Sequence, residues 1–277
     1  MTASKVLSAA PVYLLLGAIS IVMLFPLYLI VMMSLRPASS VFTYPPDLWI
    51  LSNYTFANYP DALYRLMPYV LYLRNSLIIA ALVIVGDLLS CSMVAYGFAK
   101  FRFPGRDVLF VVLLATLMMP FIVRLVPLFI LFQRLGWINT FLPLVVPAFF
   151  GTPLFIFLMR QFFLTIPSEL IDAARIDGAH EVQIWWRIML PLSTPVLTAV
   201  SIFAFQFTWN DFLGPLIFLQ KPDVRTVILG LQTMMGIAVE WQLVMAAAVA
   251  TIAPMILVFF FFQRFFIQGI AVTGLKG

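Results

Sequence analysis

The chain has 277 residues, of which 64% are hydrophobic and only 10% are charged, and its mean hydropathy is +1.08. This composition excludes a soluble globular protein, whose water-facing surface needs far more charge, and a disordered chain, which lacks so many apolar side chains. The net charge of +5 comes from basic residues scattered between apolar runs, which indicates membrane topology and not a nucleic-acid-binding surface.

Six apolar segments are long enough to cross a membrane as helices, which takes about 20 residues for a hydrocarbon core of roughly 30 Å. The first follows Lys5 and is too long for the apolar core of a cleaved signal peptide, so we expect an uncleaved span. The pattern predicts an all-α membrane protein with one transmembrane domain over residues 1–277. The expected spans are residues 11–35, 75–99, 108–133, 139–160, 192–219 and 242–266.

Prolines occur inside most of these segments. Each removes a backbone donor and favours a kink, which membrane helices tolerate when neighbouring groups satisfy the freed carbonyl. Such kinks suit a gated pathway and equally suit ordinary bundle geometry. The prolines are Pro26, Pro120, Pro127, Pro143, Pro147, Pro153, Pro195, Pro215 and Pro254.

The distribution of basic residues predicts the orientation, because cytoplasmic loops carry an excess of Lys and Arg. With the amino terminus inside, nine of the 16 basic residues face the cytoplasm, six face outward and Arg124 lies within a span. Both termini are then cytoplasmic. The longest outer loop, about 36–74, contains Trp49 and is expected to lie against the membrane face.

The inner loop of about residues 161–191 has the pattern of a helix, a break and a second helix. Ser168 suits the N-cap of the first helix, and Glu169 is an acid in its first turn. Gly178 can supply the left-handed turn that ends this helix. Pro191 is expected to open the fifth span, at a position where its missing N–H costs little.

The first of these helices has a small-residue face. Leu170, Ala173 and Ala174 share that face, and the two alanines permit close approach to a partner surface. Glu169 and Asp172 are three residues apart and therefore offer adjacent carboxylates.

The spacing of residues in this loop resembles the EAA loop of ABC-importer permeases, which reads E-A-A-x-x-x-G, nine residues, then I-x-L-P. Here Asp172-Ala173-Ala174, Gly178 and Ile188-x-Leu190-Pro191 match it without an insertion, and Asp172 shortens the acid by one methylene. Four further stretches resemble the carbohydrate-uptake branch of that family. They are Ala95–Arg106, Pro127–Phe129, Trp209–Phe212 and Gly274–Gly277.

The resemblance implies a type I, MetI-like permease core with six transmembrane helices, in a bacterial or archaeal plasma (inner) membrane. It also implies three partners: a second permease subunit in a heterodimer, a dimer of ABC ATP-binding subunits and an extracytoplasmic solute-binding protein. ATP and Mg would bind to the partner ATPase, because this chain has no P-loop motif. The chain itself is then a transport subunit without a cofactor, and no enzyme.

In such a permease the helix around 169–177 is a coupling helix that sits in a groove of the ATPase, and the tail after Arg264 also reaches that subunit. The imported solute would be a sugar or a related compound. The residues implied in ATPase coupling are Glu169, Asp172, Ala173, Ala174, Asp177, Gly178, Leu190 and Pro191.

Three ionisable residues lie inside the expected spans, where charge is costly and therefore a sign of function. Arg124 and Asp211 both fall in the outer halves of their spans, so we expect them to pair, to line the pathway or, for Arg124, to extend to the outer interface. Asp87 is a poorer match for Arg124. With Asn210 and Trp209, these residues form the candidate pathway or intramembrane pair, and Arg124 would favour an anionic or acidic sugar.

Two other classes of function stay open from the residues alone. An ion-coupled secondary transporter or channel would use Asp87 and Asp211 as proton or cation sites. A membrane-embedded enzyme is disfavoured, because the single Cys91 and the single His180 allow neither a metal cluster nor a histidine relay. An ABC exporter is disfavoured because the resemblance is to an importer loop.

Overall fold

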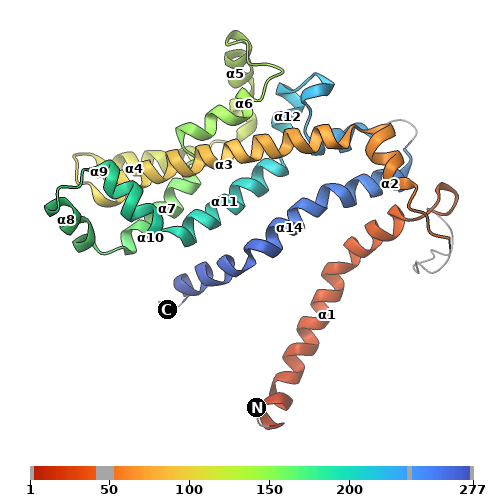
Figure 1. Ribbon diagram of the computed structural model, residues 1–277, viewed down its shortest axis with the longest axis horizontal. Helices are drawn as coiled ribbons and strands as arrows, with labels where there is room; N and C mark the ends of the chain where they lie inside the picture. The colour runs from red at the N-terminus through yellow and green to blue at the C-terminus, as the bar shows by residue number, and fades with distance from the viewer. Residues whose placement is uncertain (1–2, 42–52, 236–238, 275–277) are drawn as a thin grey trace. The chain divides into compact units, whose positions relative to one another are not determined.

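The computed structural model describes residues 3–41, 53–235 and 239–274, with side chains between residues 11 and 262 of those ranges, and its regular elements there are all helical (Figure 1). Trp49 and the side chain of Arg264 lie outside this description. In chain order the elements are α1 (Ala3–Ser34), η1 (Ala38–Ser40), α2 (Asn58–Pro60), η2 (Asp61–Leu66), α3 (Tyr69–Lys100), α4 (Arg106–Ala115), η3 (Thr116–Met118), α5 (Phe121–Arg134), α6 (Leu142–Val145), η4 (Val146–Phe150), α7 (Pro153–Thr165), α8 (Ser168–Ile176), α9 (Glu181–Ile184), η5 (Trp185–Met189), α10 (Leu190–Leu192), α11 (Thr194–Trp209), α12 (Leu213–Phe218), η6 (Pro222–Val224), α13 (Val227–Thr233) and α14 (Trp241–Gly274).

Contacts divide the chain into two compact units. The first comprises Met1–Val70 and Gly230–Pro254, and the second comprises Leu71–Leu229 and Met255–Gly277. In the first unit the side-chain amide of Asn58 donates to the carbonyl oxygens of Ser34 and Arg36, at 2.8 and 2.7 Å. These bonds satisfy carbonyls at the end of α1 that have no partner within the helix. The candidate functional features all lie in the second unit.

Four expected spans are confirmed as helices long and apolar enough to cross a membrane. These helical stretches are Pro11–Ser34, Tyr69–Lys100, Leu142–Thr165 and Trp241–Phe262. The other two expected spans, 108–133 and 192–219, are not continuous helices. Each is instead a pair of helices with a sharp bend, so the total is six spans only if each bent pair counts as one.

The third span bends by 95° between Met118 and Phe121. Met119 is extended there, with φ −79° and ψ 111°, and it directly precedes Pro120. A residue before proline avoids the helical region because it would clash with the proline ring, and proline itself has no N–H for the helix ladder. The sequence therefore contains the cause of this break, although the apolar pattern runs through it.

The fifth span bends by 82° at Ser193, between Glu181–Leu192 and Thr194–Trp209. Pro191 lies in the short helix before the bend, so the prediction that it opens the membrane span is wrong, and Pro195 occupies the first turn of α11 instead. The helix then ends at Trp209, and a separate helix, α12, follows. The expected position of Asp211, in the outer half of the fifth span, was counted along one continuous helix. That count does not apply, because α11 ends before Asp211.

Many of the prolines start helices and do not kink them. Pro143, Pro147, Pro153 and Pro195 all lie in the first turn of a helix, where the missing N–H has no intrahelical partner in any case. Pro26, Pro127 and Pro254 do lie inside helices.

One apolar core holds the second unit together. In Figure 1, α3, α7 and α11 lie side by side, and α8 to α10 lie at one end of α3. Buried side chains from all three long helices and from the inner loop belong to one cluster. Its members include Cys91, Ala95, Phe155, Met159, Phe163, Ile171, Ala174, Ile184, Met189, Val196 and Val200.

The segment Ala148–Phe149 of η4 lies close against α3 at Gly86. A Cβ atom there would lie 2.8 Å from two ring atoms of Phe149 and 3.2 Å from the carbonyl carbon of Ala148, whereas one at Gly97 on the same helix would meet nothing within 4 Å. Gly86 is therefore a packing requirement, and Gly97 is not.

We expect Gly86→Ala to destabilise the fold by about 1–2 kcal/mol, because η4 must move away. The control Gly97→Ala should be neutral or stabilising by up to about 1 kcal/mol, since alanine favours the helix. The measurement is thermal unfolding of the detergent-purified chain with a thiol-reactive dye, which reports on the fully buried Cys91, the only cysteine. Equal unfolding temperatures for the two variants would contradict the packing argument.

Candidate functional site

A cavity of about 790 Å³ within the second unit contains the three ionisable residues that the spans were expected to hold. Asp87 comes from α3, Arg124 from α5 and Asp211 from the turn between α11 and α12. Asn210 lines the same cavity. Part of its wall comes from the bend between α4 and α5 and from the turn between α11 and α12. These segments supply Thr116, Leu117, Phe121, Asn210 and Asp211.

Asp87 is buried in α3, with 2% of its surface exposed. Its Oδ1 accepts a hydrogen bond from the Thr152 hydroxyl at 2.7 Å, and the Cys91 thiol lies at 3.8 Å from the same oxygen. The Thr152 N–H donates to Cys91 Sγ at 3.2 Å. Gly151, with φ +92°, turns the chain so that Thr152 reaches α3 at the start of α7. A buried carboxylate needs such donors, so Asp87 joins α3 to α7 as well as lining the cavity.

Asp211 is held by the chain that follows it. Its Oδ1 accepts a hydrogen bond from the N–H of Gly214 at 3.1 Å, in the first turn of α12. Gly214 has no room for a side chain, because a Cβ atom would collide with the Asp211 carboxylate and with Leu144. The local turn therefore fixes the direction of this acid.

Arg124 is exposed on α5, with its guanidinium carbon 6.0 Å from the ring centroid of Phe121. Among the described residues no ion pair joins it to Asp211 or Asp87. The structure thus brings the three charges to one cavity, with both acids hydrogen-bonded by their own chain and the guanidinium open to the cavity.

Trp209, grouped with these residues from the sequence, is absent from the residues that line the cavity. It is 4% exposed and stacks on Phe205 at 5.2 Å between ring centroids, in a small apolar cluster with Ala80.

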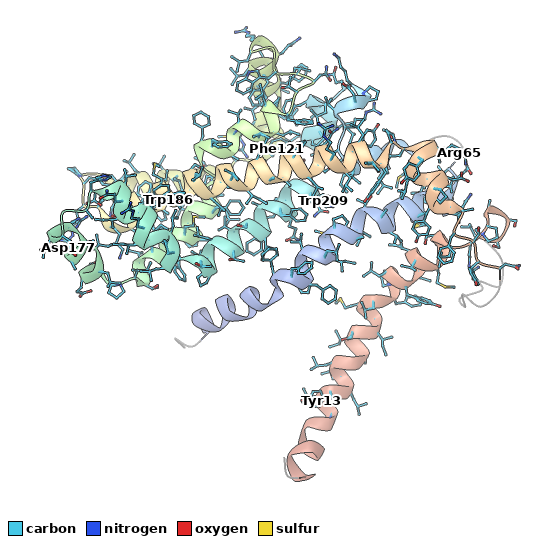
Figure 2. The ribbon with its side chains drawn as sticks, viewed as in Figure 1. Tyr13, Arg65, Phe121, Asp177, Trp186 and Trp209 are labelled. Carbon is cyan, nitrogen blue, oxygen red and sulfur yellow. The ribbon has the colours of Figure 1, made fainter. Side chains whose placement is uncertain are left out.

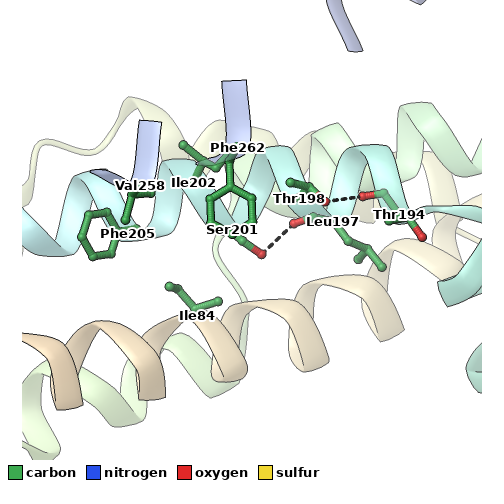
Figure 3. Close-up of a pocket in the computed structure, with 9 residues that line it drawn as sticks. All are labelled: Ile84, Thr194, Leu197, Thr198, Ser201, Ile202, Phe205, Val258 and Phe262. Atoms are coloured by element: carbon green, nitrogen blue, oxygen red, sulfur yellow. Dashed lines mark hydrogen bonds between the residues drawn. The ribbon is translucent and has the colours of Figure 1, made fainter. Parts of the chain in front are cut away.

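A second cavity, of about 380 Å³, lies between α3, α11 and the later part of α14 (Figure 3). The hydroxyl groups of Ser201 and Thr198 donate to carbonyl oxygens one turn earlier on α11, at 2.8 Å each. The groove therefore presents a nearly apolar surface and lacks the free donors that a hydrophilic solute needs.

The inner loop folds as the expected helix, break and helix. α8 ends at Ile176, and Gly178 has φ +82°. The N–H of Gly178 donates to the Arg175 carbonyl at 3.0 Å, and that of Ala179 to the Ala174 carbonyl at 2.9 Å, which is the Schellman pattern. The left-handed role of Gly178 is confirmed. The N-cap prediction is wrong, because Pro167 occupies that position and Ser168 makes no capping bond.

The two alanines of α8 do not face the same way. Ala174 is 9% exposed and packs with Ile171 in the core, whereas Ala173 is exposed. The shared face expected for Leu170, Ala173 and Ala174 is therefore wrong for Ala174. The other pattern positions divide similarly: Leu190 packs against the core, while Glu169, Asp172, Asp177, Gly178 and Pro191 are exposed. Figure 2 shows Asp177 at the tip of this loop and Trp186 at the same end of α3.

A chain of polar contacts links this loop to α3, and sequence reasoning missed its centre, Glu181. The carboxylate of Glu181 accepts hydrogen bonds from Tyr96 at 2.6 Å and from Arg175 at 2.7 Å, and Arg175 also binds Asp172 at 3.0 Å. Each oxygen of this carboxylate therefore has a donor, which satisfies its charge at the junction between the loop and α3. The sequence did contain a signal for this contact. His180 and Gln183 form a capping box that starts α9 at His180, and this places Glu181 in the first turn of that helix.

No cluster of three or more His, Cys, Asp or Glu side chains suited to a metal ion occurs in the described parts of the chain.

The sequence matches known proteins along most of its length. Residues 88–272 match the family "Binding-protein-dependent transport system inner membrane component". The arabinooligosaccharides transport system permease protein AraQ of Halalkalibacterium halodurans is 36% identical over 94% of this chain and 93% of its own length. The sn-glycerol-3-phosphate transport system permease protein UgpE of Yersinia pestis bv. Antiqua is 33% identical over 94% of each chain.

Among solved structures, one chain of a bacterial ABC transporter involved in the import of the acidic polysaccharide alginate has the same fold. Its TM-score is 0.82, at 22% identity, over 96% of this chain and 99% of that one. The family match over residues 88–272 includes the inner loop and the cavity residues Arg124, Asn210 and Asp211. The chain belongs to the family of inner-membrane components of binding-protein-dependent transport systems, and it is a transport component rather than an enzyme.

Proposed function

We propose that this chain is one permease subunit of an ATP-driven, binding-protein-dependent importer of a sugar or sugar-like solute. The observation that carries the proposal is the joint placement of a charged cavity and an exposed EAA-type loop in one packed unit. The relatives add the solute class, since their names refer to arabinooligosaccharides and to sn-glycerol 3-phosphate.

The topology that fits this function has six spans, with each bent pair crossing once, and both termini in the cytoplasm of a bacterium or archaeon. The partners are a second, different permease subunit, a dimer of ABC ATP-binding subunits that holds ATP and Mg, and an extracytoplasmic binding protein. The apolar window of α1 is exposed, with none of it buried inside this chain. Such a helix must contact lipid or another subunit.

The cavity is the part of the pathway that we assign to this chain. Arg124, Asn210 and Asp211 would contact the solute, beside the bend before α5 and in the turn after α11. Irregular backbone in a membrane is tolerated at such places if it lines a cavity. Asp87 would shape the wall through its bond to Thr152. Because both acids already accept bonds from this chain, the guanidinium of Arg124 is the main free charge, which suits a solute rich in acceptors.

The exposed face of the inner loop is the proposed ATPase contact. Leu170, Ala173 and Ile176 are exposed on α8, and Ile176 is 86% exposed. Glu169, Asp172 and Asp177 place acids around this apolar strip, which suits a groove with a basic rim. Ala174 and Leu190 support the contact from inside the core, and Gly178 and Pro191 set the ends of the loop.

The alternative is an ion-coupled transporter that uses Asp87 and Asp211. We expect uptake in proteoliposomes only when the ATPase subunits, MgATP and the solute-loaded binding protein are all present. The solute for the assay is the compound released when the copurified binding protein is denatured. Uptake that persists without ATP and follows a proton or sodium gradient would overturn the proposal.

We expect Arg124→Gln to lower uptake about tenfold or more, because a charged hydrogen-bond donor in the pathway is lost. Arg134→Gln is the matched control, since Arg134 lies on the same helix, is exposed and does not line the cavity. Exchanging the charges of Arg124 and Asp211 should not restore uptake, because no ion pair joins them within the described residues. Restoration by the exchange would instead show that the two residues act as a pair.

Substitutions at two adjacent alanines distinguish the proposed ATPase contact from the packing of the core. Ala173→Leu should leave folding unchanged and reduce copurification of the ATPase, because the added side chain obstructs an exposed contact. Ala174→Leu should lower the unfolding temperature by an amount equivalent to about 1–3 kcal/mol, because it overpacks the core. Normal ATPase binding by Ala173→Leu would contradict the proposed contact face.

A further inference from the structure

Both ends of α8 are bound to the last turns of α3. At the start of α8, the ammonium group of Lys100 donates to the carbonyl oxygen of Ile166 at 2.6 Å. At its end, Arg175 donates to Glu181, and Glu181 accepts from the hydroxyl of Tyr96 on α3. Ile171, between these points, is 2% exposed and packs in the core.

Glu181 uses each carboxylate oxygen for a different element. Oε1 accepts from the Arg175 Nε at 2.7 Å, and Oε2 accepts from the Tyr96 hydroxyl at 2.6 Å. Both are charge-assisted bonds, which are shorter and stronger than neutral ones. Tyr96 is 3% exposed and packs edge-on against Phe101 at 5.2 Å between centroids, so its hydroxyl is a fixed point of α3.

Asp172 differs from Glu181 in its freedom. Its side chain is 62% exposed and forms an ion pair with Arg175 at 3.0 Å. A basic group of a partner can therefore approach Asp172 while Arg175 keeps its bond to Glu181. Asp172 is therefore available for docking of a partner, whereas Glu181 holds α8 against α3.

Resting on the function proposed above, we propose that Glu181, together with Tyr96 and Arg175, is a positioning device that makes α8 and α3 move as one body. Asp87 lies nine residues before Tyr96 on the same helix, about 14 Å along its axis. A displacement imposed on α8 by the ATPase therefore reaches the cavity wall through α3. Apolar packing alone is non-directional and would permit α8 to slide, whereas the two bonds of Glu181 fix its register on α3.

The test uses the complete importer in nanodiscs and measures ATP hydrolysis with and without the binding protein, purified with its own bound solute. Stimulation by the binding protein reports a signal that crosses the membrane. Glu181→Gln should lower the stimulation factor at least about threefold, the effect of losing one net hydrogen bond, while basal hydrolysis and ATPase binding persist. Tyr96→Phe should do the same, and the double variant should be no worse than either single one, because both remove the same connection.

Asp107→Asn is the matched control, since it breaks an exposed acid–arginine contact of 2.9 Å on a different segment, with Arg106, and should leave stimulation unchanged. Labelling of Cys91 by the dye on heating gives the unfolding temperature of each variant and so distinguishes a loss of positioning from a loss of folding. An unchanged unfolding temperature together with lost stimulation of ATP hydrolysis supports the inference. If Glu181→Gln unfolds the chain, Tyr96→Phe, which loses only a hydroxyl, carries the test alone.

Normal stimulation in Tyr96→Phe and in any folded Glu181→Gln would overturn the positioning role, and so would a loss that merely follows a lower unfolding temperature. Absence of stimulation in the parent complex would contradict the proposed function itself, and with it this inference.

Discussion

Burial of the inner loop in the same apolar core as the membrane helices is the constraint on which the rest of the structure depends. Ile171, Ile184 and Met189 are almost fully buried, in one cluster with Cys91 of α3 and Met159 of α7. Each such side chain stabilises the packed state by about 1.5–3 kcal/mol relative to exposure. The loop is consequently a part of the bundle, and a force on its exposed face acts directly on the helices that line the cavity.

The two acids of the cavity enter this apolar unit where the chain itself supplies hydrogen-bond donors. Asp87 tolerates burial because Thr152 donates to it, and Asp211 because the turn into α12 supplies the N–H of Gly214. The breaks at Pro120 and after Trp209 leave backbone and side chains without helical partners, and these segments gather around one cavity. The proposed solute contact and the helix interruptions thus have the same structural origin.

Hydropathy located four of the spans within a few residues, because length and apolar composition are local properties that the bilayer selects directly. It did not reveal the sharp bends in the third and fifth, since Pro120 and Ser193 redirect the chain without changing how apolar it is. The inner loop was identified from residue spacing, and Gly178 from its need for positive φ. Ala174 was misplaced because helical periodicity groups residues into faces but does not say where the core lies.

From composition, spacing and local turn chemistry alone it follows that the chain spans a membrane in several helices, that a few charges lie within them, and that one loop carries the EAA-type pattern. The tertiary structure was needed to show that Asp87, Arg124 and Asp211 share a cavity, with no ion pair among these three described residues, and that Glu181 joins Tyr96 to Arg175. Tyr96 and Glu181 are separated by 85 residues, and no local rule predicts contacts between helices that meet only when an apolar core brings them together.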